Sequence, residues 1–166
     1  MKIEKFGNMA RIRPQGRKNF TVQEANATLP LVRAIAEDLV RLSREVIERR
    51  ERLSVLLGGS PRSPNDPYRE ELAQIEEELE KDRRHLREFV EELRQLGVEA
   101  RSVTEGLIDF PAMLEGRQVY LCWKLGEPEV LYWHEPGGDL NSRQPLAAGS
   151  VAEDGLPANG TNSAHS

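Results

Sequence analysis

The sequence of 166 residues has one cysteine, only 5% aromatic residues and no long apolar run. A single cysteine excludes an internal disulfide framework. The lack of an apolar run of about 18 residues argues against a transmembrane helix, and we expect no secretory leader. The net charge of −5 argues against general nucleic-acid binding. We therefore expect a soluble cytoplasmic protein without a membrane or a specific nucleic-acid partner.

Both ends of the chain differ in composition from its middle. Residues 1–19 carry six basic residues against one acidic residue, and residues 147–166 are mostly small or polar. Neither end has the apolar periodicity of a packed element. We therefore predict a basic disordered arm at 1–19, starting at Met1 or alternatively at Met9, and a disordered tail at 147–166. Residues 20–146 are predicted to form a single α+β domain.

Two long segments, at about 30–57 and 67–96, place apolar residues alternately three and four positions apart. This period is typical of helices that pack together as a coiled coil. Residues 58–67 are rich in glycine and proline and cannot continue a helix. The pattern therefore predicts a long antiparallel helical hairpin.

Short motifs mark the helix ends. Thr21 and Glu24 fit a capping box, followed by a short helical turn, and Pro30 suits the first turn of the longer helix. Asp66 is placed to cap the second helix, and Gly97 to end it.

Two polar residues, Arg49 and Asp82, interrupt the apolar series. A chain reversal at about residue 62 would place them at different levels, so we expect them not to pair. Polar residues at such positions more often set helix register than take part in catalysis. The preferred function is accordingly a non-catalytic interaction module that self-associates or binds a protein partner through the helical hairpin.

Residues of about 98–146 are predicted to form a small antiparallel sheet with a tryptophan-rich β-hairpin. Its two strands flank a turn centred on Glu127 and hold both tryptophans and the cysteine. Because side chains alternate along a strand, this pairing separates two faces. The face expected in the core carries Leu121, Trp123, Leu131 and Trp133. The open face carries Tyr120, Cys122, Lys124, Val130, Tyr132 and His134.

The open face holds the candidate chemistry. Cys122 and His134 are diagonal cross-strand neighbours, roughly 7–8 Å apart at the backbone, and a zinc ion could join them. The candidate ligands for a metal or a small molecule are Cys122, His134, Asp109 and Glu127. The residues expected to support them are Tyr120, Tyr132, Arg117 and Arg143. No paired CxxC or HxxxH motif is present, so this site is the alternative function, and no residue is assigned to catalysis.

Asp109 also has a purely structural interpretation. It lies among apolar neighbours, where a buried carboxylate needs a charged or hydrogen-bonding partner. Arg117 or Arg143 could supply that partner.

Several ordered motifs across about 20–146 resemble a bacterial family known only as domain of unknown function 2203. They are FTVQEAN at 20–26, GLIDFP at 106–111, LCW at 121–123, WHE at 133–135 and RQPL at 143–146. Residues 138–142 depart from the glycine and aromatic pattern that the family usually has before the arginine. The resemblance implies the fold and brings no activity, substrate or cofactor with it.

Overall fold

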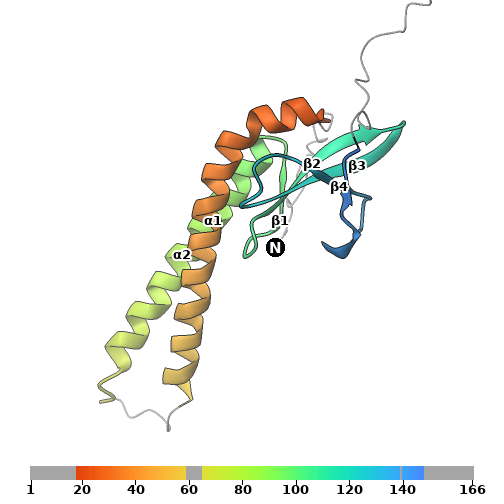
Figure 1. The fold of residues 1–166 in the computed structure, drawn as a ribbon. Coiled ribbons are helices and arrows are strands. Elements are labelled where there is room, and N and C mark those ends of the chain that lie inside the picture. Colours follow the sequence, from red (N-terminus) through yellow and green to blue (C-terminus); the bar gives the residue numbers. More distant parts are fainter. Residues whose placement is uncertain (1–17, 59–64, 139, 148–166) are drawn as a thin grey trace, which may run out of the picture.

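The computed structural model describes residues 18–58, 65–138 and 140–147, and it has the expected α+β architecture (Figure 1). Most of the predicted arm and tail lies outside these residues. No helix in the described ranges is long and apolar enough to cross a membrane. The elements in chain order are α1 (Val22–Leu57), α2 (Arg69–Gln95), β1 (Glu99–Ser102), β2 (Leu107–Leu114), β3 (Arg117–Lys124), β4 (Tyr132–His134), the short 3-10 helix η1 (Leu140–Ser142) and β5 (Gln144–Pro145).

The first helix, α1, is continuous, whereas a short turn followed by a second helix was predicted. The Thr21 hydroxyl accepts a hydrogen bond from the Glu24 amide at 3.1 Å, which confirms the predicted N-cap. Pro30 lies inside the helix, where it has no N–H to donate to the preceding turn. A proline within a helix bends it, and Figure 1 shows the first turns of α1 inclined to the rest of the helix.

The second helix, α2, begins slightly later than predicted and ends as predicted. Just before the helix, the Asp66 carboxylate accepts a hydrogen bond from the Tyr68 backbone amide at 3.0 Å. At the other end, Gly97 has a φ of 87°, a left-handed conformation that glycine adopts without strain. The Val98 amide then donates to the Leu93 carbonyl at 3.1 Å, which completes a Schellman motif and directs the chain into β1.

Arg49 and Asp82 form an ion pair between the helices, so the prediction that they do not pair was wrong. Arg49 also reaches the Glu78 carboxylate at 3.3 Å. The prediction compared residues at equal distances along the chain from the reversal, which identifies only residues at the same height in the hairpin. A long arginine side chain spans about one further helical turn, so Arg49 can reach Asp82. The pair adjoins a small apolar cluster between the helices, built from Val46, Ile75 and Leu79.

The five strands form one antiparallel sheet in the order β1-β2-β3-β4-β5. Alternate side chains of β2 and β3 join the core formed with the helices. The buried members from these two strands are Ile108, Phe110, Ala112, Leu114, Val119, Leu121 and Trp123. The helices therefore cover one face of the sheet, and the residues between these core positions point to the other face.

The pairing of β3 with β4 agrees with the predicted register, since Tyr120 is opposite His134 and Cys122 is opposite Tyr132. Two assignments near the turn were wrong. Val130 is buried in the main core, and Leu131 is exposed. Both precede β4, so strand alternation does not apply to them. The Asn26 side-chain oxygen accepts a hydrogen bond from the Val130 backbone amide at 2.8 Å, which holds this segment against α1.

Candidate metal-binding site

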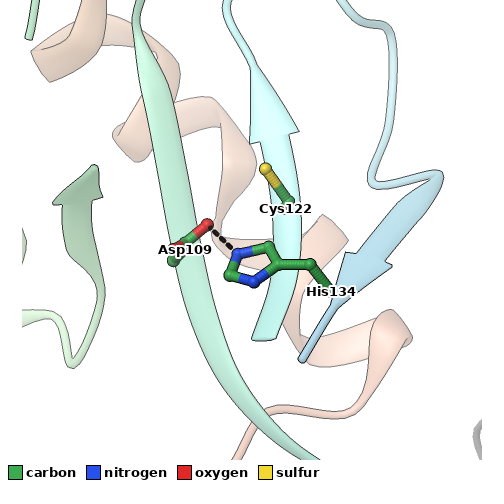
Figure 2. A group of neighbouring side chains, drawn as sticks. All are labelled: Asp109, Cys122 and His134. Atoms are coloured by element: carbon green, nitrogen blue, oxygen red, sulfur yellow. Dashed lines mark hydrogen bonds and ion pairs between the residues drawn. The ribbon is translucent and has the colours of Figure 1, made fainter. Parts of the chain in front are cut away.

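Three neighbouring strands bring Asp109, Cys122 and His134 together (Figure 2). Asp109 on β2 is paired directly with Cys122 on β3. Tyr120 lies two residues before Cys122, on the same face, and is paired with His134 on β4. One potential ligand atom from each of the three side chains lies within 4.8 Å of the other two. Three of the four predicted ligands therefore converge at one place.

This group is buried, although its face of the sheet was predicted to be open. The exposed fractions are 5% for Asp109, 0% for Cys122 and 1% for His134. The Tyr120 ring stacks on the His134 ring, with their centroids 5.5 Å apart. The Arg143 guanidinium lies 4.2 Å from the centre of the Tyr132 ring on the same face. Large side chains thus shield this face of the sheet, which side-chain alternation along the strands had predicted to be exposed to solvent.

Asp109 is the centre of the group. One carboxylate oxygen, Oδ1, lies 2.9 Å from His134 Nε2, and the other, Oδ2, accepts a hydrogen bond from Arg101 Nη1 at 3.2 Å. Together with burial, the negative charge of this carboxylate also raises the pKa of the neighbouring Cys122 thiol. The buried negative charge of Asp109 is therefore balanced by Arg101, a residue that the sequence analysis did not identify.

Arg143 lies beside the site, where it donates a hydrogen bond to the Cys122 carbonyl at 3.3 Å, and the two other charged residues predicted for the site are engaged elsewhere. Arg117 begins β3 and pairs with Glu135 at 2.9 Å, where both side chains are exposed. Arg143 pairs with Glu127 at 2.5 Å. The Glu127 carboxylate also accepts a hydrogen bond from the backbone amide of Lys124 at 2.6 Å. Glu127 is therefore committed to the turn and cannot serve as the fourth ligand, and neither arginine is the partner of Asp109.

The contacts of His134 indicate where a cation would be stabilised. Its Nδ1 lies 2.8 Å from the Glu135 carbonyl oxygen, so the tautomer that satisfies this contact carries the proton on Nδ1. In a neutral ring the Nε2 lone pair then faces Asp109, which is repulsive unless a proton or cation lies between them. Arg101 Nη1 is 2.8 Å from Nε2 and 3.2 Å from Nδ1, so it lies over the face of the ring, next to this space. The geometry around Nε2 and the carboxylate is therefore suited to holding a cation.

The Cys122 thiol is not arranged as a nucleophile. Burial, together with the negative charge of Asp109, raises its pKa to about 12, although Arg143 and Arg101 act in the opposite direction. Nucleophilic cysteines are instead partly exposed and have lowered pKa values. In the absence of a metal ion, this thiol stays protonated at neutral pH.

We expect native Cys122 to react with iodoacetamide at pH 8 at least about 100-fold more slowly than the same thiol in denatured protein. Burial removes access to the sulfur, and the raised pKa lowers the thiolate fraction. Mass spectrometry of quenched samples gives both rates. Equal rates in the native and denatured protein would contradict the buried placement of the sulfur.

Two features of the site were missed by sequence reasoning. The opposition of Asp109 and Cys122 follows from pairing β2 with β3 around the turn at Glu115 and Gly116, and this turn could have been used to set the register. The role of Arg101 depends on an irregularity in β1, for which the sequence carries no visible signal.

Comparison with known proteins identifies a family but no activity. The family model described as an uncharacterized conserved protein, DUF2203, matches residues 18–146. Neither the curated proteins nor the solved structures contain a match. The match covers both helices, all five strands and the three converging side chains. The chain therefore belongs to the DUF2203 family.

Proposed function

We propose that this protein binds one divalent transition-metal ion, with zinc the best chemical fit, through Asp109, Cys122 and His134. The observation that carries the proposal is the convergence of one oxygen, one sulfur and one nitrogen donor within 4.8 Å. Zinc accepts all three donor types. Donor atoms around a tetrahedral zinc lie about 3.3–3.6 Å apart, given its usual bond lengths. Side-chain shifts of about 1 Å would therefore close the set.

The surroundings of His134 support this proposal. A metal-bound histidine usually donates its second ring N–H to a carbonyl or carboxylate, which fixes the ring and directs the other nitrogen to the metal. The contact between Nδ1 and the Glu135 carbonyl has this form. The three donors also come from paired strands, so their backbones are held in place before an ion arrives.

Charge balance favours a divalent ion. A Cys122 thiolate and the Asp109 carboxylate together neutralise Zn²⁺, and binding would release the thiol proton. The cytoplasmic setting expected from the sequence would keep the thiol reduced. Three protein ligands leave a fourth position for water or a small molecule, so the ion could serve binding or chemistry beyond a structural role.

Zinc titration of metal-free protein tests the proposal. We expect one equivalent to bind, measured by calorimetry and by elemental analysis after dialysis. Cys122→Ala should weaken binding at least about 100-fold because it removes one of three ligands. His85→Gln, on the exposed surface of α2, is the matched control and should bind like the wild type. If the three residues form only a structural hydrogen-bond network, wild type and variants will retain no stoichiometric zinc.

A second candidate function is a non-catalytic interaction module formed by the helical hairpin. The paired helices extend well beyond the sheet (Figure 1). Large apolar side chains are exposed on this distal part, with Val55 at 77%; the others are Ile47, Leu57 and Tyr68. Pairing of two copies about a two-fold axis would cover part of this surface, and such pairing is the commonest form of self-association.

Sedimentation equilibrium tests the second candidate. We expect a dimer at tens of micromolar, and a monomer when Val55 and Tyr68 are both replaced by glutamate, because charges there would have to be buried in the interface. Leu31→Glu is the control, since Leu31 is also exposed but lies near the start of α1. A wild-type monomer at the same concentration would rule out self-association through this surface.

A further inference from the structure

We infer that Arg101 is an internal cation that lies against the metal position and must swing out when a metal ion binds. This inference rests on the proposed function and assigns a regulatory device to the same site. Arg101 Nη1 contacts both Asp109 and His134 Nε2. These are two of the three groups that would hold the metal.

The distances would place the guanidinium directly beside a bound metal ion. Arg101 Nη1 lies 2.8 Å from His134 Nε2 and 3.2 Å from Asp109 Oδ2. A zinc ion bonded to the same nitrogen and carboxylate would lie about 2.0–2.2 Å from each. The guanidinium would then be in contact with a second cation in a poorly solvated place, where like charges repel strongly. Metal binding therefore requires Arg101 to leave.

The backbone of β1 explains how Arg101 reaches the site. Ala100 is paired with Ile108, but the next pair joins Ser102 to Leu107, so Arg101 is an extra residue on β1. Such a bulge interrupts the ladder and redirects a side chain. β1 is also an edge strand of four residues. The bulge thus aims Arg101 at Asp109 from the least constrained strand next to the site.

Arg101 also has a route to solvent. Its side chain is 24% exposed, whereas that of Asp109 is 7% exposed. An arginine at an edge strand can therefore rotate outward and be hydrated, while the carboxylate stays inside. Without metal, Arg101 neutralises Asp109; with metal, the ion does so and the arginine charge appears at the sheet edge. The exchange would report metal occupancy at the protein surface.

Parallel zinc titrations of wild type, Arg101→Gln and Arg117→Gln test this inference. Arg101→Gln should bind zinc at least about tenfold more tightly than wild type because it removes the competing charge. Arg117→Gln loses the same charge from an exposed ion pair on the same sheet and should leave the affinity unchanged. Tighter binding in both variants would indicate a general charge effect and overturn the specific role of Arg101.

Hydrogen exchange on the wild type gives a second measurement that does not depend on a variant folding. Zinc should increase amide exchange at residues 99–103, where Arg101 is released, and decrease it in β2 and β3. Zinc binding with unchanged exchange at 99–103, or with equal affinity for wild type and Arg101→Gln, would overturn the inference and leave the proposed function intact. Absence of zinc binding by wild type and Arg101→Gln alike would instead overturn the proposed function.

Discussion

Replacing Asp109 by asparagine should lower the free energy of unfolding by about 2–4 kcal/mol in metal-free buffer. Asparagine keeps the shape of the side chain but leaves Arg101 without its counter-charge and weakens the contacts of Cys122 and His134. Breaking a fully buried pair typically costs about 3–5 kcal/mol. The partial exposure of Arg101 lets it relax toward water, which reduces the expected loss.

Urea denaturation measures this loss, with Glu135→Gln as the control. That change breaks the Arg117–Glu135 pair, in which both side chains are 58% exposed. Exposed ion pairs contribute less than about 1 kcal/mol. If Asp109→Asn cost no more than Glu135→Gln, the carboxylate would not be the centre of a buried network.

Trp123→Ala should destabilise the protein by about 3–5 kcal/mol, the usual cost of removing a large aromatic side chain from a core. Trp123 is fully buried in the core shared with the helices, and its indole N–H donates to the Glu127 carbonyl at 2.9 Å. Trp133 is only partly buried against the same core. Trp133→Ala should therefore cost clearly less.

Chemical denaturation of the two alanine variants, followed by far-ultraviolet circular dichroism, makes this comparison without relying on tryptophan fluorescence. Strand alternation alone assigns both tryptophans to one buried face and predicts similar losses. Equal losses would show that Trp133 is as deeply packed as Trp123, in conflict with the described core.

Local regularities explain which features could be predicted from the sequence. The register of β3 with β4 follows from side-chain alternation around a short turn, so Cys122 and His134 were placed on one face correctly. The end of α2 follows from the left-handed conformation that Gly97 adopts there. In both cases a few neighbouring residues determine the geometry.

Features that depend on distant contacts could not be predicted. The bulge that turns Arg101 toward Asp109 breaks the alternation on which strand reading relies. The burial of Cys122 and His134 depends on shielding by large side chains such as Tyr120. The Arg49–Asp82 pair depends on side-chain length in addition to the level of each residue in the hairpin.

Cobalt substitution shows whether Asp109, Cys122 and His134 bind a metal ion. Cobalt(II) binds the same donor types as zinc, and its absorption spectrum reports both coordination number and a bond to thiolate. We predict that one equivalent gives the visible bands of a four-coordinate ion and an ultraviolet sulfur-to-cobalt charge-transfer band. Cys122→Ala should lose the charge-transfer band, and His85→Gln should keep it. A wild-type spectrum that shows only hydrated cobalt would contradict metal binding by these three residues.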